Sequence, residues 1–267
     1  MAEITFIMLL IQMGTVILCL LFGSYMDLIK REVSDIPWII MAIVGLITTI
    51  IYIIFSENKG MDGTIIGINL GVGIAIGLIL YYTGMMGGAD AKAIMALSLN
   101  TAIYPFVFEL TSTPVYAFVP PIFNTFFNWL LTLVLIYPLP LLFYNIYLKI
   151  KKQELFKDTN ANFASKILMM ISGYLIPVEK ARDRTDIVYS EVYNVEEEEW
   201  EIKHFMQVPE IEEEEKYKEE VETFIQKTKR ENIWVKILPP GIVFLLIGYV
   251  INIFLGNILF TLYHWFL

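Results

Sequence analysis

The stretch Gly84-Met85-Met86-Gly87-Gly88-Ala89-Asp90-Ala91-Lys92 places a carboxylate between two apolar segments of the chain. Residues 64–83 before it carry no charged side chain, and the apolar run 93–97 follows it directly. A carboxylate at the junction of two membrane-length segments is costly unless it is paired, hydrated or functional. Small residues precede Asp90, and they allow another backbone to approach closely. We therefore expect Asp90 to meet a partner from elsewhere in the chain.

The composition places this junction in a membrane protein. The 267 residues are 57% hydrophobic, and the mean hydropathy of +0.61 is too high for a soluble domain of this length. Several uncharged runs reach the roughly 20 residues that a helix needs to cross a bilayer. A transmembrane β-barrel would show short alternating segments instead. We expect an all-α polytopic protein embedded in the lipid bilayer, and nothing is basic enough to predict nucleic-acid binding.

Six segments have the character of transmembrane helices. Asp35 is placed to cap the second, and Pro37 fits its first turn. The third carries two small-xxx-small pairs, Gly67/Gly71 and Gly73/Gly77, which allow close helix packing in lipid. Prolines in the fifth predict a kink. The predicted spans are 4–26, 36–55, 64–83, 90–108, a segment within 115–148, and 241–266.

Residues 149–236 differ in character, because they hold most of the charged residues of the chain. Segment 163–177 is apolar but too short to span, so we expect an interfacial or core helix there. Segments 187–195 and 200–205 have the β-branched and aromatic residues of strands, and 212–230 has helical periodicity. The predicted domains are a five-helix membrane part (1–148), a small soluble α+β domain (149–236) and a sixth transmembrane helix (237–267).

Basic residues near the span ends predict the orientation. Lys30 and Arg31 follow the first span, Lys92 begins the fourth, and further lysines border the soluble region, whereas the other side has Lys59 alone. The soluble domain and the start of the fourth span are therefore expected to face the cytoplasm, with both termini outside.

This orientation brings Asp27, at the end of the first span, to the same membrane face as Asp90. Two close carboxylates share one proton, so one can act as a base towards water while the other polarises a carbonyl. That is the chemistry of an aspartic protease, which requires no cofactor. The single cysteine, Cys19, and two distant histidines, His204 and His264, predict no metal site.

A family resemblance rests on these residues. Gly87-Gly88-Ala89-Asp90 is similar to the GxGD motif of intramembrane aspartyl proteases, with alanine where bacterial prepilin peptidases have glycine. Asp27 and the following segment 30–35 resemble the first-aspartate segment of type IV prepilin peptidases. The layout, with a soluble insertion before the last span, looks most like an archaeal preflagellin (prearchaellin) peptidase.

The resemblance implies an endopeptidase that removes the short basic leader from preflagellin or type IV pilin-like precursors at the cell membrane. Asp27 and Asp90 would be its catalytic pair, and the motif residues Gly87, Gly88 and Ala89 would support Asp90. Lys30, Arg31 and Lys92 are foremost orientation signals, and a role towards substrate or in the electrostatics of the pair is the second interpretation.

Other interpretations stay open at this point. Asp90 could simply cap the fourth helix, and Asp27 could be an ordinary interfacial residue. A proton-coupled transporter would also use intramembrane carboxylates, although it favours mid-membrane positions and an internal repeat. A membrane scaffold that docks partners through the soluble region is a third alternative.

Overall fold

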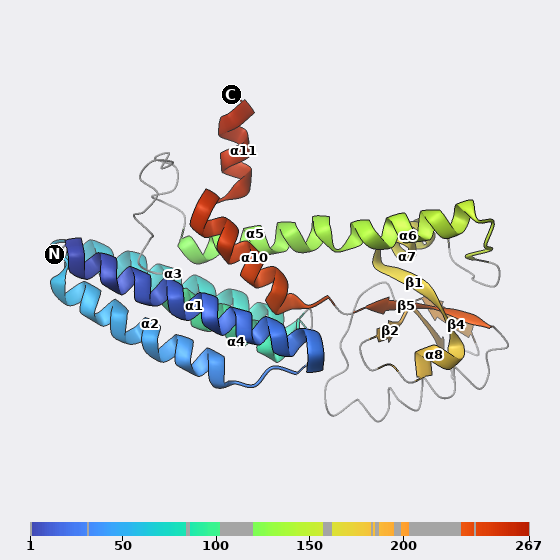
Figure 1. Cartoon of the computed structure of the whole chain (residues 1–267), viewed down its shortest axis with the longest axis horizontal. Coiled ribbons are helices and arrows are strands. Elements are labelled where there is room, and N and C mark those ends of the chain that lie inside the picture. The colour runs from blue at the N-terminus through green and yellow to red at the C-terminus, as the bar shows by residue number, and fades with distance from the viewer. Residues whose placement is uncertain are drawn as a thin grey trace. The chain divides into compact units, whose positions relative to one another are not determined.

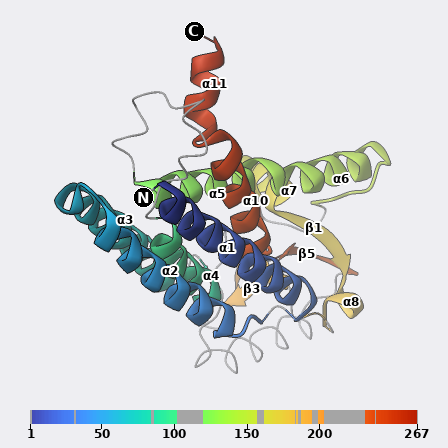
Figure 2. The same cartoon turned by 60° about the vertical axis from the view of Figure 1, so that its left-hand side comes forward.

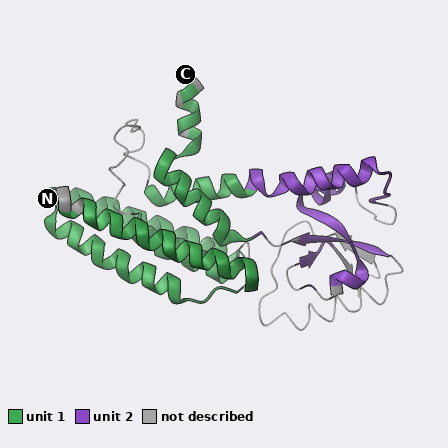
Figure 3. Ribbon diagram, viewed as in Figure 1, with its two compact units in different colours: residues 1–133, 240–267 green, residues 134–239 purple. Residues whose placement is uncertain are grey.

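The computed structural model describes residues 2–30, 32–83, 86–101, 120–156, 162–182, 184, 187–194, 199–202, 231–237 and 239–266. The chain divides into two compact units (Figure 3), residues 1–133 with 240–267, and residues 134–239. The domain division predicted from composition, at residues 148/149 and 236/237, stays a prediction.

Unit 1 is a bundle of apolar helices (Figures 1 and 2). Four segments of the chain are long and apolar enough to cross a bilayer: Phe6–Lys30, Ile36–Phe55, Lys59–Tyr82 and Pro121–Ile150. A multi-pass membrane protein is therefore supported, whereas the predicted count of six spans is not reached among the described residues. The helices of this unit are α1 (Ala2–Lys30), α2 (Ile36–Phe55), α3 (Lys59–Tyr82), α4 (Gly88–Asn100), α5 (Pro121–Ile136), α10 (Gly241–Leu255) and α11 (Ile258–Phe266).

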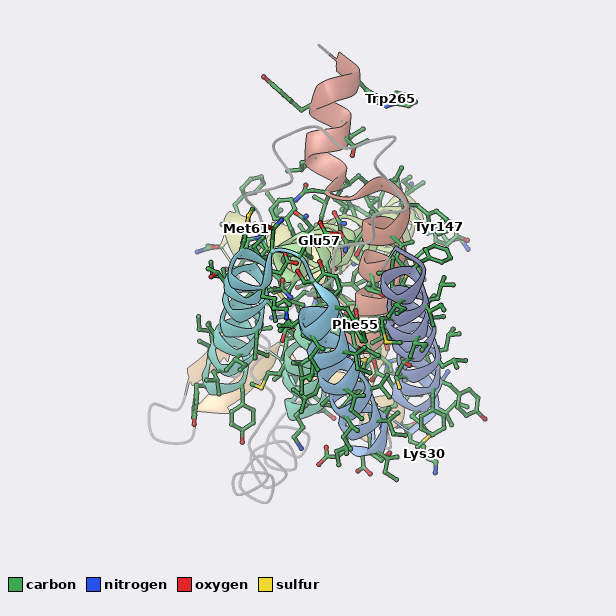
Figure 4. The ribbon with its side chains drawn as sticks, turned by 90° about the vertical axis from the view of Figure 1, so that its left-hand side faces the viewer. Lys30, Phe55, Glu57, Met61, Tyr147 and Trp265 are labelled. Carbon is green, nitrogen blue, oxygen red and sulfur yellow. The ribbon has the colours of Figure 1, made fainter. Side chains whose placement is uncertain are left out.

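The ends of these helices refine the predicted spans. Helix α3 begins five residues before the predicted start, because the polar residues from Lys59 onwards continue the helix (Figure 4 labels Phe55, Glu57 and Met61 around the turn). The predicted fourth span begins as expected near Asp90, but its second part lies outside the described residues. The expected interruption of the fifth falls at Tyr137, where α5 ends and Pro138 starts α6 (Pro138–Ile150).

The last predicted span, 241–266, was wrong as a single helix. It is broken between α10 and α11, where Gly256 adopts a φ of 66°, a left-handed conformation that favours glycine. The Asn128 amide of α5 forms hydrogen bonds on both sides of the break. Its Nδ2 donates to the Gly256 carbonyl at 2.7 Å, and its Oδ1 accepts from the Ile258 N–H at 3.1 Å. Backbone groups released by a break in an apolar helix must find such partners.

The two glycine pairs of α3 have different surroundings. A Cβ at Gly77 would lie 2.6 Å from Met95 Cγ and 3.0 Å from the Ala91 carbonyl oxygen, and Gly73 faces the Ser98 side chain. This pair lets α3 pack closely on α4. A Cβ added at Gly67 or Gly71 would meet no atom of another described segment within 4 Å. Among the described residues, the predicted close packing is therefore seen for Gly73/Gly77.

Buried amides join neighbouring helices of unit 1. Asn69 donates to the Ser98 carbonyl at 2.7 Å and accepts from the Ile122 N–H at 2.9 Å, which ties α3 to α4 and α5. Asn100 donates to the Met41 carbonyl of α2 at 2.7 Å. Away from water, neutral side chains that satisfy backbone groups in this way hold helices together.

The described residues of unit 2 form α6, α7 (Phe163–Ser172), α8 (Val178–Arg182) and five strands. Strands β1 (Gly173–Pro177), β5 (Asn232–Ile237) and β2 (Ile187–Tyr189) form an antiparallel sheet in the order β1-β5-β2, and β3 (Glu191–Asn194) pairs with β4 (Glu199–Ile202). One side of the sheet packs Ile176, Tyr189 and Val235 in a small core. On the other, Trp234 packs with Met169 of α7 and Leu155.

The predictions for this region were partly right. The two predicted strands correspond to β2, β3 and β4, with Ser190 between β2 and β3. Segment 163–177 is a helix only as far as Ser172, because Gly173 leaves the helix in an extended conformation and pairs with Lys236. Strand β5 was missed, and the predicted helix 212–230 lies outside the described residues.

Candidate active site

Helix α1 brings Asp27 to the start of α10. A Cβ at Gly23, one turn earlier, would lie 2.7 Å from the Trp38 ring and 3.1 Å from Ile242 Cγ2. The absence of a side chain at Gly23 thus lets α2 and α10 approach α1 closely. Since residues four apart share a helix face, Asp27 points towards the same neighbour. Its Oδ2 accepts a hydrogen bond from the Ile242 N–H at 3.3 Å.

Helix α4 brings Asp90 to the adjacent residue of α10. A Cβ at Gly241 would lie 2.8 Å from Asp90 Cγ and 2.9 Å from Oδ2, which is closer than real Cβ atoms come to other groups. The Asp90 carboxylate therefore lies directly against the Gly241 backbone. Asp27 and Asp90 meet two consecutive residues of one helix, and the charge of Asp27 acts on Asp90.

The start of α10 is itself held by α5. The buried Trp129 indole N–H donates to the Gly241 carbonyl at 3.0 Å. A buried tryptophan needs such a partner for its polar atom. Trp129 thereby fixes the backbone that separates the two carboxylates, and Gly248 lets this helix pass close to the Trp129 backbone one to two turns further on.

Both residues keep part of their surface exposed at this end of the bundle, while the Asp90 carboxylate itself is largely desolvated. The first N–H groups of a helix have no partners within it and carry a partial positive charge, so the start of α10 suits acidic groups. Two coupled carboxylates with access to water can perform general acid–base chemistry on a peptide bond.

The motif residues before Asp90 form the helix start. Gly87 occupies the N-cap position of α4, and its carbonyl accepts from the Asp90 N–H at 3.1 Å. Asp90 is thus inside the first turn, and the alternative in which it caps the helix is wrong. A Cβ at Gly87 would lie 3.7 Å from Asp90 Oδ2, and one at Gly88 would lie 3.6 Å from Tyr81, both ordinary contacts. Ala89 is partly exposed beside them.

The basic residues near the pair have other surroundings. Lys92 donates to both Asp35 oxygens, at 2.8 and 2.9 Å, in an ion pair that is more than half exposed. The Asp35 side chain makes no capping hydrogen bond to α2, so the predicted cap is wrong, although Asp35 occupies the N-cap position. Lys30 ends α1 and points to solvent (Figure 4). Arg31 lies outside the described residues.

Sequence reasoning missed Gly241 and Trp129. The pair Pro239-Pro240 marked the start of a span, but nothing in the sequence indicated that Gly241 would meet the Asp90 carboxylate, 151 residues earlier. The available signal was the dipeptide Pro240-Gly241, which marks a turn but does not predict what the glycine will meet. Trp129 has no sequence signal that separates it from the other aromatic residues of its segment.

Comparisons with known proteins show what this chain is similar to. Residues 14–139, which contain both aspartates, match the model of the type IV leader peptidase family. A preflagellin peptidase from Methanococcus voltae is 25% identical over 254 residues, which cover 90% of this chain and 93% of that protein. The likeness of this chain to the type IV leader peptidases, and among them to a preflagellin peptidase, is therefore confirmed.

Proposed function

We propose that this protein is a membrane aspartic endopeptidase that cleaves the short basic leader from preflagellin-like or type IV pilin-like precursors. The observation that carries the proposal is the meeting of Asp27 and Asp90 at consecutive residues of α10. The leader peptidase match covers the residues that form this meeting point. The transporter and scaffold alternatives gain no support from the comparisons.

The two carboxyl groups would divide the chemistry between them. The ionised one takes a proton from a water molecule as the water oxygen attacks the peptide carbonyl carbon, and the protonated one donates its proton to the carbonyl oxygen. Collapse of the tetrahedral intermediate then breaks the carbon–nitrogen bond, and the departing amine takes up a proton from the pair. Because the groups titrate as a unit, the shared proton belongs to the pair.

The substrate argument rests on charge and orientation. The basic residues near the span ends favour a cytoplasmic site, where a leader with lysine or arginine would remain while the following apolar helix enters the bilayer. Glu32 is exposed at the same end of the bundle as the pair. Exposed carboxylates attract a basic leader over about 10 Å at moderate salt.

The test is cleavage of a precursor with a Lys/Arg-rich leader by the purified protein, followed by mass spectrometry. Asp27→Asn and Asp90→Asn should each lower the rate by at least roughly 10²–10⁴-fold, the range of a lost acid–base group. Each variant should keep the elution profile and melting temperature of the parent. Asp35→Asn, at a third acidic position near this membrane face, is the matched control and should remain active. Near-normal cleavage by either dyad variant would refute the aspartic mechanism.

A further inference from the structure

Helix α7 of unit 2 has an unusual outward face. Its fully exposed positions, Phe163, Ala164, Ile167 and Leu168, are all apolar. The partly exposed positions are Lys166, Met170, Ile171 and Ser172, and Lys166 lies over the Phe156 ring. Phe163 is 80% exposed. The buried positions Ser165 and Met169 lie on the opposite side. A helix on a soluble domain normally shows its polar face to water, so this arrangement is inverted.

The position of α7 beside α6 offers an explanation. The buried Asn145 amide of α6 donates to the Met170 carbonyl at 2.8 Å and to the Gly173 carbonyl at 2.7 Å, which fixes the end of α7. Helix α6 is the last part of the apolar segment Pro121–Ile150, and its Tyr147 (labelled in Figure 4) is 51% exposed. Helix α7 is therefore attached to a helix that itself has an exposed apolar surface.

The lysines at the end of α6 indicate how deep in the bilayer the contact between α6 and α7 would lie. Lys149, Lys151 and Lys152 are exposed at the end of α6, and Glu154 is the acidic residue beside them. Basic residues directly after an apolar segment mark the level of the headgroups. Asn145 lies one turn before Lys149, or about 6 Å along the helix. Amphipathic helices enter a bilayer to a similar depth, roughly 5–10 Å.

We propose that the apolar face of α7 lies in the lipid interface beside α6 and that the lysines at the end of α6 bind anionic headgroups. The occupant of this face is thus a phospholipid bilayer surface with negative charge. At ten residues α7 is too short to cross the bilayer. The contact would hold unit 2 against the membrane through α7 as well as α6. This inference does not depend on the catalytic role of the aspartates.

The experiment uses the full chain in nanodiscs that hold one copy each. In a Cys19→Ala background, Leu168→Cys or Phe163→Cys carries an environment-sensitive fluorophore. Lipids with a spin label near the headgroup act as the quencher. A cysteine at the exposed Glu179 of α8 is the control. We expect roughly a twofold or greater loss of fluorescence at 168 and 163, and little at 179.

The second measurement varies the charge of the lipids and of the lysines at the end of α6. The quenching at 168 should be stronger in discs with anionic lipid than in zwitterionic ones, and Lys149→Gln with Lys151→Gln and Lys152→Gln should remove this difference. Two results would overturn the proposal: labels at 168 and 163 that behave like the label at 179, or protection that appears only with two copies per disc. The second result would assign the face to a second copy of the chain.

Discussion

The bundle of unit 1 uses polar side chains in two different ways. Away from the start of α10, Asn69, Asn100 and Asn128 are neutral, buried and bonded to backbone groups of neighbouring segments. At the end where α10 begins, Asp27 and Asp90 are ionisable and meet consecutive residues of α10, and the charge of Asp27 acts on Asp90. Neutral amides thus hold the helices of this bundle together, whereas the two ionisable groups lie together at one end of it.

The largest effect is expected when a buried amide is replaced by a carboxylate, and a carboxylate of the pair by an amide. Asn69→Asp would replace the donor to the Ser98 carbonyl by an anion beside an oxygen that also carries negative charge. An unpaired buried charge costs at least about 3 kcal/mol, so we expect a large loss of stability. Thermal unfolding in detergent, followed by circular dichroism, measures it. The reverse exchange, Asp90→Asn, should leave the melting temperature nearly unchanged, and equal losses in both variants would remove the contrast.

Gly241→Ala tests the contact between α10 and the carboxylates. The added Cβ would collide with the Asp90 carboxylate and move it, and small displacements of catalytic groups cost on the order of 10²-fold in rate. We expect a lower rate of leader cleavage together with a lower melting temperature. In an Asp90→Ala background the collision disappears, so Gly241→Ala should no longer lower the melting temperature.

Gly67→Ala is the matched control for this experiment, because that position faces open space in the described chain. It should change neither rate nor stability. A Gly241→Ala variant with the same stability loss in both backgrounds would show that Asp90 is not what the glycine accommodates.

Asn128→Ala tests the amide side of the comparison at the break between α10 and α11. The substitution removes two hydrogen bonds to backbone groups, one on each side of the break. At about 1 kcal/mol for each bond, we expect a loss of about 2 kcal/mol, read from the same thermal unfolding. Cleavage by the remaining folded protein should be little affected. A stability unchanged from the parent would mean that the break is supported by other groups.

Sequence patterns predicted those features that depend on local composition. Long uncharged runs predicted the apolar helices. The position of Asp27 and Asp90 beside basic residues predicted that both lie at one end of the bundle. The structure brings both to α10, while their catalytic role stays a proposal. The break at Gly256 and the strand β5 were missed, because the first depends on the Asn128 amide and the second on pairing with distant strands.

The same limit explains the errors at the candidate site. Asp35 has the residue type and position of a helix cap, but its carboxylate forms an ion pair with Lys92, 57 residues later. Gly241 and Trp129 matter through contacts between helices that are far apart in sequence. Local pattern reasoning cannot see such contacts, since they exist only once the helices are packed.

The exposed ion pair between Lys92 and Asp35 gives the smallest expected effect. Lys92 is two residues from Asp90, which suggested a role in tuning the catalytic pair, yet positions two apart on a helix point in nearly opposite directions. Exposed ion pairs contribute about 0–1 kcal/mol, and salt weakens them. Lys92→Gln should therefore lower the melting temperature slightly at low salt and not at high salt, with the cleavage rate and its pH profile unchanged. A shifted pH profile would show that Lys92 acts on the carboxylates of Asp27 and Asp90. The Lys92–Asp35 ion pair would then be part of the reactive site and not only a surface contact.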